Sequence, residues 1–357
     1  MHDKLFTPGP TEVRPELLNE LANPQIHHRT IEFTKLYDDI QANLKELLFT
    51  DNPVFLFTSS STGAMEAAVC NGVKKRCLNL VNGAFGERWH EITVMNGIPC
   101  DKLEVEWNKA IKAEMVEEKL ATGKYDAVTL VSNDTSTGIL NPVQEIGEVI
   151  KKYDDVLFLV DAVSAMAGTE IRVDDWGIDM CLAGLQKAFA LPAGLAVASI
   201  SEKILVRAEK VEKRSFYFNL PLMYKYHKRG QTPSTPAIPQ MFALKKQLDD
   251  IIDGEGIKNR FKRHREMASY VHKWALKYFD IYPEEGYWSQ TMTCVVNTRD
   301  ISVDELNSKL VEKYSCRIAN GYGDLKNKCF RIAHMGDMNL VDIRGLLSSI
   351  NEILDLK

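Results

Sequence analysis

Residues 156–194, VLFLVDAVSAMAGTEIRVDDWGIDMCLAGLQKAFALPAG, contain two short apolar runs that decide the fold. The first run ends at Asp161, and the second leads into Gln186 and Lys187. Each run has the length and β-branched content of a buried parallel strand rather than of a helix. Asp161 and Lys187 are therefore expected at the carboxyl ends of strands, the edge at which open α/β sheets bind ligands.

A carboxylate and an amine at that edge match the needs of one cofactor, pyridoxal phosphate. Its ring nitrogen must stay protonated, and a buried carboxylate such as Asp161 holds that proton by charge attraction. The cofactor is also tethered by a lysine that has lost its proton, a role that Lys187 fits. Taken singly, Asp161 could instead cap a helix and Lys187 could be a solvated loop lysine, so the assignment depends on the surrounding pattern.

The composition is that of an ordinary soluble globular protein. The chain has 357 residues, 45% of them hydrophobic, which is enough for one large core and a smaller second domain. The formal net charge of −5 shows no basic excess for nucleic acid or an anionic membrane, so a small-molecule substrate is expected. The amino terminus lacks the apolar core of a signal peptide, and no apolar run is long enough to span a membrane. We expect a cytoplasmic protein.

The cysteines and histidines do not suggest a metal site. The seven cysteines are odd in number and form no CxxC pair, which is typical of reduced core cysteines. His27 and His28 are adjacent, so their side chains do not converge well on one ion, and no carboxylate spacing supports them. With Arg29 next to them, contact with an anion is favoured.

Strands and helices alternate from Val54 to about Ser201, which indicates a large domain with a mostly parallel sheet between helices. The segment 217–239 is rich in Pro, Thr and aromatic residues and is predicted to be a long ordered loop. Further strands are expected at 54–58, 77–81, 127–132, 291–298 and 328–333, and helices at 108–122, 237–252, 256–279, 303–314 and 340–356. We expect an arm at 1–15, a large domain at 16–255 and a small α/β domain at 256–357.

Three turns that follow predicted strands carry polar or aromatic residues at the same sheet edge. SSSTGAMEA brings hydroxyls and free backbone N–H groups to a helix start, which suits a phosphate or a simple N-cap. Phe85 in NGAFG could lie on a pyridine ring or fill the core. Ser136 and Thr137 in NDTSTG could donate to the ring hydroxyl or satisfy their own turn. Val163 could pack under the ring if the strand through Asp161 extends that far.

These motifs occur in a recognisable order. With TPGPT, SSSTGAMEA, NGAFG, NDTSTG, VDAVSA, GLQKAFALPAG and FRIAHMG present, the chain resembles the class V aminotransferases of fold type I, which depend on pyridoxal phosphate. The nearest likeness is to the branch with alanine–glyoxylate and serine–pyruvate aminotransferases. The resemblance covers nearly the whole chain and implies a large domain built on a mostly parallel sheet plus a small C-terminal α/β domain.

The resemblance also implies roles for individual residues. Lys187 would carry the cofactor, Asp161 would pair with its ring nitrogen, and Phe85 and Val163 would enclose its ring. Arg331 would grip the substrate α-carboxylate, for which a bidentate fork is well suited. The remaining implied contacts are Ser60, Ser61, Thr62 and Gln186 at the phosphate, Thr235 at the phosphate of the partner subunit in a homodimer, Ser136 at the ring oxygen, and Gly9 at the substrate.

Three positions depart from the family pattern. Thr232 stands where a tyrosine is often found, Leu185 where Ser or Thr is usual, and Ser61 where glycine is common. The phosphate contacts are therefore expected to differ in detail.

The implied activity transfers an amino group from alanine or serine to glyoxylate or pyruvate. One alternative is a phosphoserine or 2-aminoethylphosphonate transaminase, in which His28 and Arg29 would bind the second anion. A cysteine desulfurase or lyase would need a cysteine in a glycine-rich polar loop, and none stands there. A non-catalytic scaffold on this fold would have no use for a buried amine facing a buried carboxylate.

Overall fold

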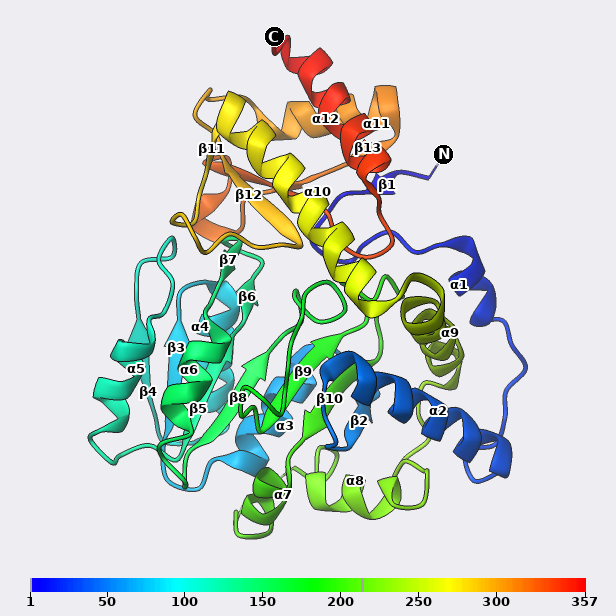
Figure 1. Cartoon of the computed structure of the whole chain (residues 1–357), viewed down its shortest axis with the longest axis vertical. Helices are drawn as coiled ribbons and strands as arrows, with labels where there is room; N and C mark the ends of the chain where they lie inside the picture. Colours follow the sequence, from blue (N-terminus) through cyan, green and yellow to red (C-terminus); the bar gives the residue numbers. More distant parts are fainter. Residues whose placement is uncertain (1, 213–214) are drawn as a thin grey trace.

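The computed structural model describes residues 2–212 and 215–357; Met1 of the expected arm lies outside the described residues, as do Lys213 and Arg214. A seven-stranded sheet forms the centre of its larger part (Figure 1). The strand order is β2-β10-β9-β8-β5-β3-β4, and all neighbours are parallel except the two pairs that β10 makes. The strands are β2 (Val54–Phe57), β3 (Cys77–Val81), β4 (Cys100–Glu104), β5 (Ala127–Val131), β8 (Leu157–Asp161), β9 (Met180–Gly184) and β10 (Ala196–Ile200). The predicted α/β architecture with a mostly parallel sheet is confirmed.

Helices on both faces of this sheet explain why its strands read as continuous apolar runs. Every residue of β2, β3, β5, β8, β9 and β10 is buried. Successive side chains of β2 alternate between two cores, with Val54 and Leu56 in one and Phe55 and Phe57 in the other. The flanking helices are α2 (Ile31–Leu48), α3 (Ser61–Gly72), α4 (Ala84–Met95), α5 (Ala113–Leu120), α6 (Val143–Ile150) and α7 (Glu202–Glu209).

A second, four-stranded sheet lies above the first in Figure 1 and is covered by the C-terminal helices. Its order is β11-β12-β15-β14, with antiparallel neighbours throughout. The expected boundary after residue 255 falls between a π-helical turn (Asp250–Glu255) and the long helix α10. The elements are α10 (Ile257–Tyr278), β11 (Asp280–Ile281), β12 (Met292–Val296), α11 (Val303–Tyr314), β14 (Ala319–Asn320), β15 (Cys329–Ala333) and α12 (Leu340–Leu354).

The N-terminal arm joins the two sheets. Its strand β1 (Lys4–Leu5) pairs with β13 (Cys316–Arg317), and Phe6 is buried in the core of the second sheet. Thr11 then donates its backbone N–H to the carbonyl of Gln186 and its hydroxyl to the carbonyl of Lys187. The short helix α1 (Pro15–Glu20) follows. The arm therefore passes over the lysine that the sequence singled out.

The segment 217–239 is not the continuous loop that was predicted, because it contains helix α8 (Leu220–His227). The Asn219 side chain caps this helix by accepting the Leu222 N–H at 3.0 Å, and Pro221 occupies the first turn, where its missing N–H costs nothing. Helix α9 (Ile238–Asp249) begins immediately after the loop. The local capping signal outweighed the unfavourable composition.

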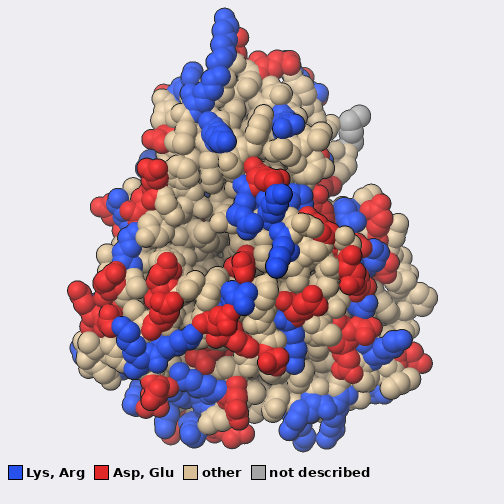
Figure 2. Space-filling model, viewed as in Figure 1, with Lys and Arg blue, Asp and Glu red and all other residues tan. Residues whose placement is uncertain are grey.

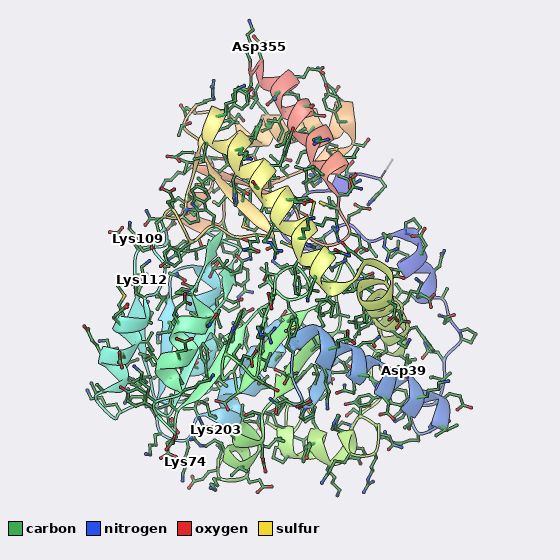
Figure 3. The ribbon with its side chains drawn as sticks, viewed as in Figure 1. Asp39, Lys74, Lys109, Lys112, Lys203 and Asp355 are labelled. Carbon is green, nitrogen blue, oxygen red and sulfur yellow. The ribbon has the colours of Figure 1, made fainter. Side chains whose placement is uncertain are left out.

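Charged side chains of both signs are mixed over the face shown in Figure 2. Lys109 and Lys112, labelled in Figure 3, both pair with Glu284, which ties the segment before α5 to the residues before β12. Over residues 2–212 and 215–357, no helix is long and apolar enough to cross a membrane.

Candidate active site

Asp161 and Lys187 come together at the carboxyl edge of the large sheet, as the sequence predicts. Asp161 is the last residue of β8, and Lys187 follows three positions after the end of β9, its neighbour in the sheet. The two residues are only 3% and 7% exposed. The Lys187 Nζ donates to the Pro8 carbonyl and, at 3.2 Å, to the Thr135 hydroxyl. Its amine is thus held in place rather than solvated.

Burial shifts both groups toward their uncharged forms. It lowers the pKa of Lys187 to about 8; Asp161 opposes this shift, whereas the charge on Arg331 adds to it. About one-tenth of such amines are neutral at pH 7. Burial raises the pKa of Asp161 to about 7, and the Val163 N–H, which donates to Oδ1 at 2.8 Å, only partly opposes this. A protonated ring nitrogen placed against Asp161 would restore the carboxylate form.

Phe85 lies against the lysine, with Nζ 5.7 Å from the centre of its ring. It belongs to the first turn of α4 rather than to an open turn. The Asp134 carboxylate accepts the Phe85 N–H at 3.0 Å and so fixes the start of the helix. Val163 does not continue the strand, because β8 ends at Asp161; it is half-buried in the following turn.

Thr135, rather than Ser136, faces the lysine. Ser136 donates its hydroxyl to Asp134 at 2.5 Å and accepts the Ala84 N–H at 3.0 Å, so it supports the start of α4. Thr135 accepts from Lys187 through its hydroxyl, and its carbonyl accepts from Arg331 Nη1 at 3.0 Å. The sequence offered no signal for this choice, because three hydroxyl residues stand side by side and the hairpin of β6 (Asn133–Asp134) and β7 (Ile139–Leu140) decides their directions.

Thr135→Val should lower the pKa of Lys187 by about 0.7 pH unit, because one hydrogen bond to the ammonium, worth roughly 1 kcal/mol, is lost. The midpoint is measured from the pH dependence of Lys187 labelling by an amine-reactive reagent in the cofactor-free protein. Thr137→Val is the matched control, since the Thr137 hydroxyl bonds within its own turn, to the Asp134 carbonyl and the Ile139 N–H. Equal shifts in both variants would contradict a direct contact.

Ser60, Ser61 and Thr62, the residues expected to contact a phosphate, stand at the N-terminus of α3. Ser60 is the N-cap but makes no side-chain cap bond, and the Gly63 N–H donates to its carbonyl at 3.0 Å. The backbone N–H groups of Ser61 and Thr62 precede it in the first turn, where a helix can bind an anion. A Cβ on Gly184 would lie 2.4 Å from Gln186 Oε1 and 2.5 Å from Ser61 Oγ. Because Gly184, at the end of β9, has no side chain, the Gln186 amide and the Ser61 hydroxyl can both lie close to its backbone. Thr62 follows in the first helical turn.

Gly9 covers the lysine from the arm. Its φ of +109° is a conformation that side-chain-bearing residues rarely adopt, and a Cβ there would lie 2.7 Å from both Cδ and Cε of Lys187. Because Thr11 fastens the arm to the backbone of residues 186 and 187, this close approach is fixed. Any larger residue at position 9 would displace the lysine.

Arg29 contacts the loop 232–235 in the single chain, and its binding of an anion together with His28 stays a prediction. Its guanidinium donates to the carbonyls of Thr232 at 2.8 Å and Pro233 at 3.2 Å. It therefore holds the loop that carries Thr235. Thr235 itself is exposed in the single chain, so its contact with a partner's phosphate stays a prediction.

Comparison with known proteins places the chain in a family. The sequence model of the family Aminotransferase class-V matches residues 11–321. The chain belongs to the class V aminotransferases. An uncharacterized aminotransferase of Methanocaldococcus jannaschii is 40% identical, covering 97% of this chain and 91% of the relative. A serine–glyoxylate aminotransferase of Methylorubrum extorquens is 29% identical over 96% and 89%. The solved aspartate aminotransferase of Thermus thermophilus, subgroup IV, has a TM-score of 0.91 at 26% identity, covering 99% of each chain.

The family establishes a fold type I aminotransferase, and its members use pyridoxal phosphate. The residues of this class V aminotransferase fit that group. A buried amine with a lowered pKa, a buried carboxylate and an open helix N-terminus stand on one sheet edge.

Proposed function

We propose that this aminotransferase moves the amino group of alanine or serine to glyoxylate or pyruvate, with pyridoxal phosphate attached to Lys187. The observation that carries the proposal is the buried Lys187 amine, whose pKa burial lowers and on which the charges of Asp161 and Arg331 act in opposite directions. The serine–glyoxylate relative supports the choice of donor and acceptor. We also infer a homodimer in which the exposed Thr235 reaches the partner's cofactor phosphate.

Arg331 would orient the substrate through its α-carboxylate. Its Nε and Nη1 donate to the carbonyls of Asn320 at 2.9 Å and Thr135 at 3.0 Å, which fixes the plane of the guanidinium. Neither contact neutralises its charge, and it forms no ion pair with any Asp or Glu in the described part of the chain. The remaining N–H groups can then hold a carboxylate in one orientation.

Lys187 and Asp161 would handle the protons. When bound, pyridoxal phosphate supplies the electron sink for the carbanion at the substrate α-carbon. Lys187 would hold the cofactor, and its Nζ, whose pKa burial lowers, would in its neutral form serve as the base for the α-proton. The Pro8 carbonyl and the Thr135 hydroxyl keep Nζ in position. Asp161 holds the proton on the ring nitrogen throughout.

The proposal is tested by absorbance spectra of the cofactor-loaded protein after addition of alanine or serine, followed by glyoxylate or pyruvate. Conversion of the bound cofactor to its amine form by one donor, and its return with one acceptor, is the expected result. Absence of any change with alanine or serine would contradict the proposed donors.

Arg331→Gln should raise the KM for alanine about 100-fold, or ~2.7 kcal/mol, because one charge-assisted contact to the α-carboxylate is lost. Binding of pyridoxal phosphate, followed by absorbance, should stay unchanged. An unaltered KM would remove Arg331 from the substrate site.

A further inference from the structure

A second guanidinium, that of Arg88 on α4, lies at the site without a role so far. Its Cζ lies 4.8 Å from the centre of the Phe85 ring, the same ring that Lys187 Nζ approaches to 5.7 Å. The charge on Arg88 acts on both Lys187 and Asp161, favouring the neutral amine and the carboxylate. Arg88 is thus near the reacting centre although it is not among the residues that the family pattern indicated.

Tyr322 connects Arg88 to the arginine proposed to bind the α-carboxylate. Its phenol oxygen accepts from Arg88 Nη2 at 3.4 Å, and the Arg331 Cζ lies 5.6 Å from the centre of its ring. The ring also lies 5.8 Å from that of Phe85. Two guanidinium groups are therefore separated by a single tyrosine side chain, beside the aromatic ring next to the lysine.

The loop that carries Tyr322 is tightly folded. The Gly321 N–H donates to the Cys329 carbonyl at 2.9 Å, and a Cβ on Gly321 would lie only 1.9 Å from the Leu325 carbonyl oxygen. The Leu325 N–H in turn donates to the Tyr322 carbonyl at 3.0 Å. The carbonyl of Asn320, which precedes Gly321, accepts from Arg331 Nε at 2.9 Å. The same loop therefore places both the phenol and the α-carboxylate arginine.

The charges around this loop are not balanced. Within residues 2–212 and 215–357, Arg88 forms no ion pair with a carboxylate, and its polar contact is the long one to Tyr322. The nearby Asp134 is used by backbone N–H groups of Phe85, Gly86 and Ser136. One substrate carboxylate can neutralise Arg331 only, so a half-buried Arg88 still lacks an anion.

We propose that Arg88 and the Tyr322 hydroxyl bind a second, distal carboxylate, so that the donor class includes short dicarboxylic amino acids such as aspartate. The inference rests on the proposed function and extends its substrates. A carboxylate suits the pair because one guanidinium and one phenol supply the donors that its two oxygens accept, whereas a phosphate dianion presents more acceptors than these two groups satisfy. Because both arginines contact the same tyrosine side chain, we test the proposal first with a short, four-carbon dicarboxylate.

The test uses succinate and butyrate, which share four carbons but differ in one carboxylate and have no amino group to transfer. Their binding to the cofactor-loaded protein is measured by calorimetry, so the result does not depend on turnover. We expect succinate to bind more tightly than butyrate. Arg88→Gln should weaken the binding of succinate about tenfold and leave the binding of butyrate unchanged. Tyr322→Phe should weaken the binding of succinate about threefold.

Arg344→Gln is the matched control, because Arg344 is exposed on α12 and also lies over an aromatic ring, 5.5 Å from the centre of Tyr270. It should leave both ligands unaffected. Equal binding of succinate and butyrate to the parent protein would overturn the proposal. Equal losses of affinity for both ligands in Arg88→Gln would also overturn it, since that pattern would show a merely structural role for Arg88.

Spectral half-reactions with aspartate, alanine and phosphoserine separate this inference from the proposed function. Conversion by aspartate that falls about tenfold more than conversion by alanine in Arg88→Gln supports it. Conversion by alanine without any by aspartate would overturn the inference and leave the function standing. A preference for phosphoserine over aspartate would overturn the assignment of the distal group as a carboxylate.

Discussion

Lys187→Ala should abolish transamination, with a loss of at least about a thousandfold in kcat, because the variant has neither the amine that holds the cofactor nor the base for the α-proton. The absorbance band of lysine-bound cofactor should also disappear. Both are measured on purified protein incubated with pyridoxal phosphate, with circular dichroism to show that the fold is kept.

Lys74→Ala serves as the control, since Lys74 is an exposed lysine just beyond the C-terminal end of α3, opposite to the end expected to meet the phosphate, and is labelled near the lower edge of Figure 3. It should keep full turnover and the absorbance band. If Lys187→Ala kept both, the assignment of the carrier lysine would be wrong.

Asp161→Asn is expected to lower kcat by about a thousandfold, ~4 kcal/mol, while the protein still binds cofactor. Asparagine keeps an oxygen for the Val163 N–H but cannot hold a proton on the ring nitrogen by charge. Single-turnover spectra with alanine measure the loss directly, because they separate proton transfer from binding.

Asp179→Asn provides a matched comparison for Asp161. Asp179 is also buried, and its pKa is also raised by burial, but its carboxylate bonds to the Ser201 hydroxyl and the Phe158 N–H just before β9 begins. The variant should lose stability, seen as a lower Tm, and keep the turnover of each folded molecule. Equal loss of turnover in both variants would show that Asp161 acts only through the fold.

Several parts of the fold could be predicted from the sequence because their signals are local. The strand Cys77–Val81 and the helix Val303–Tyr314 have the predicted bounds. The apolar run of the strand and the Ser302 cap of the helix each lie within a few neighbouring residues. Helix α8 was missed because its favourable signals, the Asn219 cap and Pro221 in the first turn, stand among residues that disfavour helices.

The sequence by itself determined the sheet edge, the pairing of Asp161 with Lys187 and the family. Only the tertiary structure decided which hydroxyl meets the lysine, that Gly9 covers it, and that Arg88 and Tyr322 stand beside it. The physical reason is the separation along the chain of the residues that interact. Strand periodicity and caps depend on near neighbours, whereas these contacts join segments far apart in the chain, whose meeting depends on packing of the two sheets and on side-chain directions that no local pattern encodes.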